Sequence, residues 1–260
     1  MIRTRGHAAL VYGELWFDEE TPDGDDVDVL LYRRRRSPLA GHDNQAYPSL
    51  VTALDVAEDD IAARFDETCG YQVRRAAQRD ELRLQASADP AGVLERFRSF
   101  FDRFAAQKSL APSDGAWLAA ACAAGQLALT AAEKDGEALV WHAYLLSGST
   151  ACLLHSASWF RQGDNAYRSL VGRANRWLHW RSMLWFRAAG LHRYDWGGMF
   201  DDESTPERAG INRFKRSFGG TPERRYDCTL PHSVRGRMLL PLRDAWRRLK
   251  ANPALRNVIA

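Results

Sequence analysis

The chain has 260 residues, of which 45% are hydrophobic and 27% charged, enough to bury a sizeable core as one large or two small domains. Its 36 Lys and Arg residues against 33 Asp and Glu give a formal net charge of +3, too small to predict nucleic-acid binding by itself. The four cysteines lie far apart without a Cys-x-x-Cys pair, which argues against a zinc site and against a disulfide framework.

No targeting or membrane segment is predicted. Residues 1–7 lack the apolar core of a secretory signal, and no apolar run approaches the ~20 residues that a membrane span requires. The spread of cysteines suits a reducing compartment. We therefore expect a soluble, cytoplasmic protein, and the sequence does not indicate how many subunits assemble.

The first 90 residues are predicted to hold three strands and a helix. The β-prone runs 8–16 and 27–32 flank an acidic, turn-rich segment, which predicts a hairpin over residues 6–36. A third strand is predicted at 49–56. The acidic residues 58–60 then mark the start of a helix whose apolar positions recur to about residue 73.

The rest of the chain alternates helices with a strand meander. The helical and strand patterns, in chain order, are helices 90–107 and 113–124, strands 126–132, 138–146 and 150–158, helix 166–189, strand 191–196 and strand 224–230. Apolar residues at helical spacing predict a helical tail over 232–260, with a kink at Pro241.

The densest group of chemistry-bearing residues lies within 191–220. A strand there ends in Tyr194, Asp195, Trp196, Gly197 and Gly198, and the two glycines let a substrate or a second chain come close. The segment 210–220 then interleaves cations with aromatics, as Arg213, Phe214, Lys215, Arg216 and Phe218. This pattern suits an anion or polar-substrate site. The alternative is a strand end followed by a turn of amphipathic helix with its charges in solvent.

The two segments 194–198 and 210–220 resemble the paired signature of the FemABX peptidyltransferase family. That family comprises acyltransferases of the GNAT fold that build peptidoglycan cross-bridges, with relatives that act on other cell-envelope or metabolite amines. Trp196 stands where the family usually has Phe, and Ser217 where Gly is common. The segments 50–55 and 71–76 resemble the same relatives less closely.

The resemblance implies an α+β fold with a GNAT-like mixed, mostly antiparallel sheet flanked by helices. The predicted order, an antiparallel meander that feeds one helix and then a further strand, agrees with it. We expect residues 1–90 to form a reduced N-terminal GNAT-like unit, 91–231 a complete acyltransferase unit, and 232–260 a helical tail packing back.

Direct acyl transfer needs a proton acceptor for the attacking amine and donors for the tetrahedral oxyanion. Asp195 is the candidate for accepting the proton or orienting the amine, and Lys215 for oxyanion stabilisation or donor phosphate contact, as the family resemblance implies. The candidate substrate-binding residues are Tyr194, Trp196, Gly197, Gly198, Arg213, Phe214 and Arg216. The alternative for Asp195 is a cap of the following turn.

The sequence leaves two candidates for the acyl donor, acyl-CoA and aminoacyl-tRNA. CoA-using relatives cradle pyrophosphate with a loop that the segment 169–174 matches only in part, so Arg168, Gly172 and Arg173 bind a cofactor only if acyl-CoA is the donor. Relatives that take aminoacyl-tRNA lack that loop, which favours aminoacyl-tRNA. We expect no permanently bound cofactor and no metal.

The leading hypothesis is an N-acyltransferase whose acceptor is an amine of a cell-envelope precursor, a nucleotide-linked sugar or a small metabolite, with tRNA as a further partner. One alternative is an acetyl- or acyl-CoA-dependent N-acetyltransferase. The other is a non-catalytic relative that binds an anion or a protein partner through the cations of segment 210–220.

Overall fold

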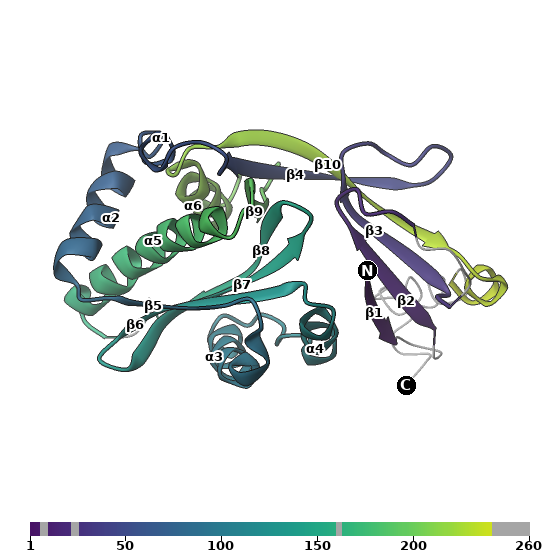
Figure 1. Cartoon of the computed structure of the whole chain (residues 1–260), viewed down its shortest axis with the longest axis horizontal. Coiled ribbons are helices and arrows are strands. Elements are labelled where there is room, and N and C mark those ends of the chain that lie inside the picture. The colour runs from purple at the N-terminus through teal and green to yellow at the C-terminus, as the bar shows by residue number, and fades with distance from the viewer. Residues whose placement is uncertain (6–9, 22–25, 160–162, 241–260) are drawn as a thin grey trace. The chain divides into compact units, whose positions relative to one another are not determined.

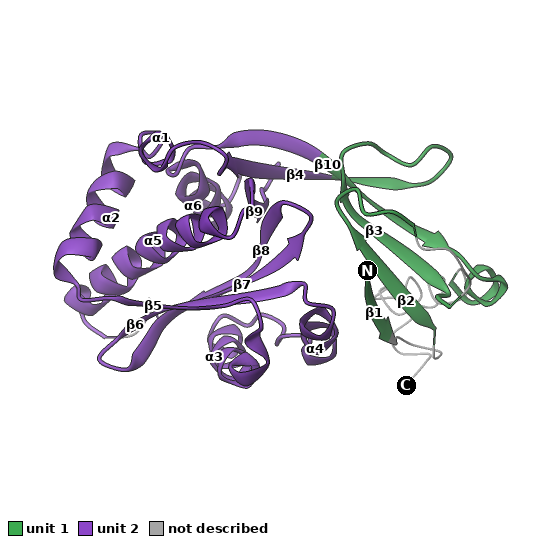
Figure 2. Cartoon of the chain, viewed as in Figure 1, with its two compact units in different colours: residues 1–46, 225–260 green, residues 47–224 purple. Residues whose placement is uncertain are grey.

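The computed structural model describes residues 1–5, 10–21, 26–159 and 163–240 (Figure 1). The chain forms two compact units, residues 1–46 with 225–260, and residues 47–224 (Figure 2). Their boundaries fall elsewhere than the domains expected from the sequence, 1–90, 91–231 and 232–260, so that division stays a prediction. Residues 234–240 are helical, and the predicted kink at Pro241 lies outside the described residues.

The smaller unit is built on four strand segments. They are β1 (Ile2–Arg5), β2 (Val11–Trp16), β3 (Val29–Arg35) and the second half of β10 (Thr221–Pro231), neighbours in that order. Leu15, Leu30 and Tyr32 pack with Cys228 into one of its cores.

The hairpin predicted over residues 6–36 is wrong. The strands β2 and β3 run parallel, with Tyr12 opposite Val29, and the antiparallel neighbour of β2 is β1, a strand that the sequence analysis missed. The connection through residues 17–28 is long enough, at about a dozen residues, to carry the chain back to the start of a parallel strand. The Asp28 amide donates to the Val11 carbonyl oxygen, and the Val11 amide donates to the Asp28 carboxylate, so these bonds hold the two strand starts together.

The larger unit contains a mixed sheet. In spatial order its strands are β4 (Asn44–Ala53), β9 (Arg193–Gly198), β8 (Thr150–Ser158), β7 (Glu137–Ser147), β6 (Leu127–Lys134) and β5 (Arg83–Ser87). All neighbouring pairs are antiparallel except β8 with β9. This arrangement confirms the expected mixed, mostly antiparallel sheet, although β5 was not predicted.

Helices cover both faces of this sheet. Figure 1 shows α2 (Glu67–Arg79) and α5 (Asn165–Ala188) on one face, and α3 (Leu94–Gln107) and α4 (Gly115–Ala123) on the other. A short 3-10 turn, Pro90–Gly92, precedes α3, and α6 (Pro206–Arg216) links β9 to β10.

The single helix predicted from residue 58 is two helices. The first, α1 (Glu58–Ala62), ends early, and α2 starts anew where the Asp66 carboxylate accepts a bond from the Cys69 amide at 2.7 Å. An Asp side chain at this position satisfies one of the free amides of a helix start, which explains the restart. The start of α4, predicted at residue 113, is capped by the carboxylate of Asp114, which accepts a bond from the Trp117 amide at 3.0 Å.

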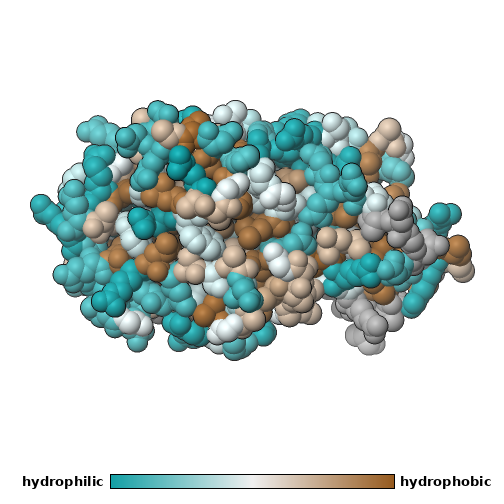
Figure 3. Space-filling model, viewed as in Figure 1, coloured by the Kyte–Doolittle hydropathy of each residue, from teal (hydrophilic) through white to brown (hydrophobic). Residues whose placement is uncertain are grey.

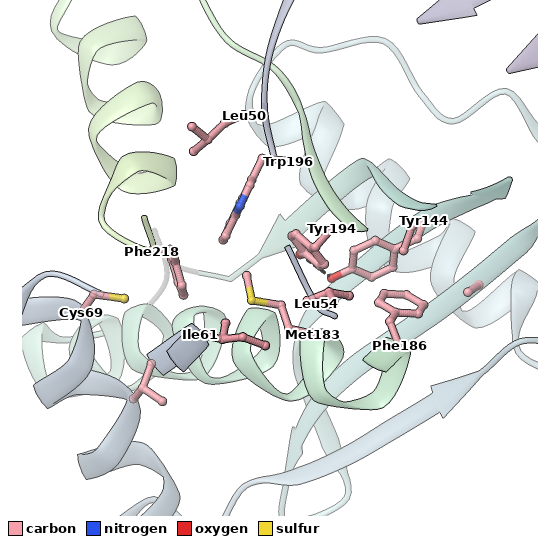
Figure 4. Packing of buried hydrophobic residues seen from close by; sticks show 13 residues of the cluster. Leu50, Leu54, Ile61, Cys69, Tyr144, Met183, Phe186, Tyr194, Trp196 and Phe218 are labelled. Atoms are coloured by element: carbon pink, nitrogen blue, oxygen red, sulfur yellow. Dashed lines mark hydrogen bonds between the residues drawn. The ribbon is translucent and has the colours of Figure 1, made fainter. Parts of the chain in front are cut away.

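One hydrophobic core of this unit lies between α5 and the sheet. Its buried members include Met183 and Phe186 of α5, Tyr144 of β7, and Tyr194 and Trp196 of β9 (Figure 4). On the face shown in Figure 3, hydrophilic residues occupy most of the outer margin of this unit. Within the described residues, no helix combines the length and apolar character that crossing a membrane demands.

Candidate active site

The site is organised by the separation of two parallel strands. Strand β8 pairs with β9 only from Thr150 to Cys152, opposite Arg193 to Asp195. Beyond this point Gly197 adopts a left-handed backbone with φ of 68°, and a Cβ there would lie 2.7 Å from the carbonyl oxygen of Leu153. Only glycine fits so close to a backbone atom in this conformation. The glycine predicted to open the strand end is thus required by its local geometry.

Two of the predicted substrate-binding residues, Tyr194 and Trp196, lie in the core. Both side chains are fully buried. The hydroxyl of Tyr194 lies 2.7 Å from Nδ1 of His179 and 3.0 Å from the Tyr144 hydroxyl (Figure 4), and Trp196 Nε1 donates to Thr52 Oγ1 at 3.0 Å. Both side chains point from β9 into the core, and their contact with substrate stays a prediction.

Asp195 points to the opposite side of β9, because side chains alternate along a strand. Its Oδ1 accepts a bond from the Gly197 amide at 2.8 Å and a short one from the Ser49 hydroxyl. The carboxylate is buried, with 1% of the residue exposed. Ser49 reaches it because β4 carries a bulge between Ser49 and Val51. Sequence analysis missed Ser49, since its strand pairing with β9 joins distant segments.

Lys215 lies in the last turn of α6 and faces the end of β9. Its ammonium donates to the carbonyl oxygen of Gly198 at 2.6 Å. Burial lowers the pKa of Lys215 to about 8, and the negative charge of Asp195 opposes that shift. The two candidate catalytic residues therefore lie near enough for the charge of Asp195 to act on the pKa of Lys215.

A buried asparagine fixes the loop between β9 and α6. Asn212 exchanges hydrogen bonds with the backbone of Phe200, at 2.8 and 3.1 Å, and donates to Glu203 at 2.8 Å. Arg216 pairs with the same Glu203 carboxylate at 2.6 Å. Arg213 is exposed. Two of the predicted cations therefore lie near the surface, whereas Lys215 faces inward.

A cavity of about 420 Å³ opens beside these residues. It is lined by residues of β4, of the loop after β9 and of the start of β10: Pro48, Ser49, Leu50, Met199, Phe200, Asp201, Glu203, Arg216, Pro222, Glu223 and Arg224. Ser49 is the contact between this cavity and Asp195. A polar substrate could reach the carboxylate through that hydroxyl.

A buried polar network lies under the site. Nε2 of His142 lies 2.8 Å from Asn175 Oδ1, and Nδ1 lies 2.9 Å from the Tyr144 hydroxyl, which continues through Tyr194 to His179. Burial lowers the pKa of His142 to about 4 and that of His179 well below its usual value. Both imidazoles are therefore neutral near pH 7.

The residues assigned to a CoA donor lie elsewhere. Arg168, Gly172 and Arg173 are inside α5, where backbone amides serve the helix itself, and none lines the cavity beside Ser49. Arg173 forms a bidentate pair with Asp80 at 2.7 and 2.8 Å. Among the described residues, no group of three or more His, Cys, Asp or Glu could hold a metal ion.

Solved structures share this fold. FemX superposes with a TM-score of 0.58 at 16% identity over 75% of this chain, which spans 63% of the FemX chain. L-PGS from Bacillus licheniformis gives 0.52 at 11% identity, covering 83% of this chain and 72% of that one. A protein assigned as the C-terminal domain of a lysylphosphatidylglycerol synthetase, from Agrobacterium fabrum, gives 0.50 at 14% identity, covering 84% and 72%.

The sequence comparisons identify the family. No curated protein sequence matched the chain. The model of the acetyltransferase (GNAT) domain matches residues 63–216, more than half of the chain, and these residues contain α2, α5, β9 and Lys215. The expected fold and the expected resemblance are both confirmed. The chain therefore belongs to the acetyltransferase (GNAT) domain family.

Proposed function

We propose that the protein transfers an aminoacyl group from aminoacyl-tRNA to an amine of a cell-envelope precursor, a nucleotide-linked sugar or a small metabolite. The observation that carries this proposal is that a half-buried ammonium, Lys215, lies close enough to the buried carboxylate of Asp195 for that carboxylate to raise its pKa against the effect of burial. Lys215 is held on the Gly198 carbonyl oxygen, and Asp195 is held by Ser49 at the wall of the cavity. These are the two charges that direct acyl transfer uses.

Lys215 supplies positive charge where negative charge develops. Attack of the amine on the ester carbonyl forms an N–C bond and places charge on the carbonyl oxygen. With a pKa of about 8, Lys215 is mostly protonated at pH 7 and can donate to that oxygen. When the ester C–O bond breaks, the departing oxygen of the RNA takes a further proton from the now positively charged attacking nitrogen and leaves as the terminal hydroxyl.

Ser49 offers a route for the proton of the amine. The attacking nitrogen gives its proton to Ser49 Oγ while the Ser49 proton passes to Asp195 Oδ1, so that the amine becomes neutral and the carboxylate becomes protonated. This relay lets Asp195 act although it is buried. The neighbouring cavity has the volume of a small-molecule site and can hold the acceptor.

Two observations support aminoacyl-tRNA over acyl-CoA as the donor. The segment 169–174 lies within α5, so its amides do not form a free pyrophosphate cradle, and Arg173 is neutralised by Asp80. The similar structures also include a lysylphosphatidylglycerol synthetase, whose name denotes aminoacyl transfer. The acetyltransferase description of the matching family favours acyl-CoA as the second candidate donor.

A donor assay with two arms tests the proposal. In one arm, tRNA charged with a mixture of labelled amino acids is incubated with the protein and amine acceptors; in the other, acetyl-CoA replaces it and thiol release is followed. We expect acceptor-dependent discharge of the RNA that Lys215→Ala abolishes and that Lys108→Ala, a change at an exposed lysine, leaves intact. Thiol release alone would assign CoA as the donor, and silence in both arms would point to a binding protein.

A further inference from the structure

A second cavity, of about 340 Å³, opens between α2 and α5. Its lining includes four arginines, Arg75 of α2 with Arg168, Arg173 and Arg176 of α5, and the aromatic Tyr71. No Asp or Glu is among the described residues that line it. Asp80 neutralises Arg173 from outside this set, so three guanidinium groups remain to set the charge of the groove.

The charge in this groove acts on the tyrosine. Arg75 Nη1 donates to the Tyr71 hydroxyl at 3.1 Å, and this bond, together with the charges of Arg75, Arg79 and Arg173, lowers the pKa of Tyr71. The side chain of Tyr71 is 53% exposed, so its ring is open to a ligand. An open aromatic ring beside several arginines is the arrangement with which proteins stack a base and hold its phosphate.

Arg176 lies at the inner end of the groove. Its Nε is buried and finds no hydrogen-bond acceptor in the part of the chain that the structure describes. Its guanidinium lies 4.8 Å from the centroid of the Phe214 ring, and Phe214 immediately precedes Lys215. A buried donor without an acceptor is unfavourable unless a ligand supplies one. Arg176 thus belongs to the groove lining and also contacts the ring of Phe214, the residue before the candidate catalytic lysine.

The spacing of the arginines favours a chain of phosphates over a single one. Arg168 and Arg176 lie on one face of α5, about 12 Å apart along its axis at about 1.5 Å per residue. Successive phosphates advance about 3.4 Å along the axis of a duplex strand and lie farther apart in an extended single strand. A row of cations about 12 Å long is therefore longer than a pyrophosphate and can contact more than one phosphate of a single strand.

We propose that the groove between α2 and α5 binds a single-stranded polynucleotide, with its phosphates on Arg75, Arg168 and Arg176 and a base on Tyr71. This proposal rests on the proposed function, under which the strand is the terminal segment of the donor RNA. Its end would lie at Arg176, whose guanidinium contacts the Phe214 ring. Binding in the groove needs no turnover, so it can be measured separately from the transfer reaction.

The test is fluorescence anisotropy with a labelled single-stranded RNA oligonucleotide over a series of salt concentrations. We expect Arg75→Ala/Arg168→Ala to weaken binding by about tenfold or more and to reduce the slope of log K against log salt by about 1.4, or about 0.7 for each phosphate contact. The matched control is Arg83→Ala/Arg181→Ala, which removes the same charge from exposed positions outside the groove and should bind like the wild type.

Two further variants separate the contacts. Tyr71→Ala should weaken binding by about fivefold or more through loss of stacking, whereas Tyr71→Phe, which keeps the ring, should bind nearly as well as the wild type. Lys215→Ala should bind the RNA normally even if it transfers nothing. Equal losses in both double-arginine variants would overturn the proposal, as would saturable binding of CoA by a protein that does not bind the RNA.

Discussion

The ammonium of Lys215 donates to the carbonyl oxygen of Gly198 at 2.6 Å and so joins the last turn of α6 to the end of β9. An ammonium is costly to bury, and its pKa of about 8 records that cost. Chains retain such groups mainly where their charge acts on a ligand. The position of this lysine, near Asp195, is therefore the feature on which the proposed chemistry depends.

The first prediction is that the rate falls as pH rises through about 8. The pKa of Lys215 is lowered from 10.5 to about 8, so the cation that stabilises the oxyanion is lost above that pH. Lys215→Arg keeps a charge at all accessible pH values. The variant should therefore lose the descending limb, measured as kcat between pH 6 and 10, even if its rate is lower throughout.

Lys215→Ala should lower the rate while changing the free energy of unfolding little. Removing the buried charge relieves its desolvation, while the Gly198 carbonyl oxygen loses its donor, and these opposing effects should leave the free energy of unfolding within about 1 kcal/mol of the wild type. The rate should fall by well over tenfold. A large loss of stability would instead show that the lysine serves the fold.

The second prediction concerns the Ser49 relay. Ser49→Ala removes the hydroxyl between the cavity and Asp195 and should lower kcat by about a hundredfold, the lower range of general-base effects. Ser49→Thr keeps a hydroxyl and should restore much of the rate. If both variants were equally impaired at temperatures where each is folded, the relay would be excluded and water would be the proton acceptor.

Elements with local sequence signals were predicted, whereas pairings between distant segments were not. The meander β6 to β8, helix α5 and strand β9 were predicted because alternation, helical periodicity and turn residues are local signals. The hydrogen bond from Ser49 to Asp195 joins residues 146 positions apart. No local pattern encodes that pairing or the bulge that allows it, and for the same reason the parallel pairing of β2 with β3 was missed.

The sequence pattern also did not predict which polar residues are buried. The pattern of α5 predicted an apolar inner face, yet His179 and Ser182 lie on it, paired through the tyrosines and threonine of neighbouring strands. Likewise Tyr194, which matches the family signature, and Trp196, which stands at its Phe position, both lie in the core. A motif fixes residue types at a site without stating which of them face the substrate.

The third prediction uses two glycines of the signature as a matched pair. At Gly197 an added Cβ would meet the Leu153 carbonyl oxygen at 2.7 Å in a left-handed conformation, so Gly197→Ala should destabilise the protein by about 2 kcal/mol or more. At Gly210, inside α6, a Cβ meets nothing within 4 Å. Gly210→Ala should therefore stabilise by about 0.5–1 kcal/mol. Urea unfolding of both variants checks this, and similar effects at the two positions would contradict it.

The last prediction is a loss of stability on mild acidification that originates in His142. The pKa of this buried imidazole is about 4 in the folded protein against 6.5 when unfolded. Between these values the unfolded state binds more protons, so the free energy of unfolding falls as pH drops from 6.5 to 4. A difference of 2.5 pKa units corresponds to about 3 kcal/mol. His179 acts in the same direction.

Urea unfolding at a series of pH values should show this loss in the wild type and in His192→Gln, which changes an exposed histidine, and a shallower loss in His142→Gln. His142→Gln is expected to be less stable at pH 7, because it loses the bonds to Tyr144 and Asn175. The test is therefore the slope of the free energy of unfolding against pH, not its value at pH 7. An unchanged slope in that variant would mean that His142 is not neutral in the folded protein across this range.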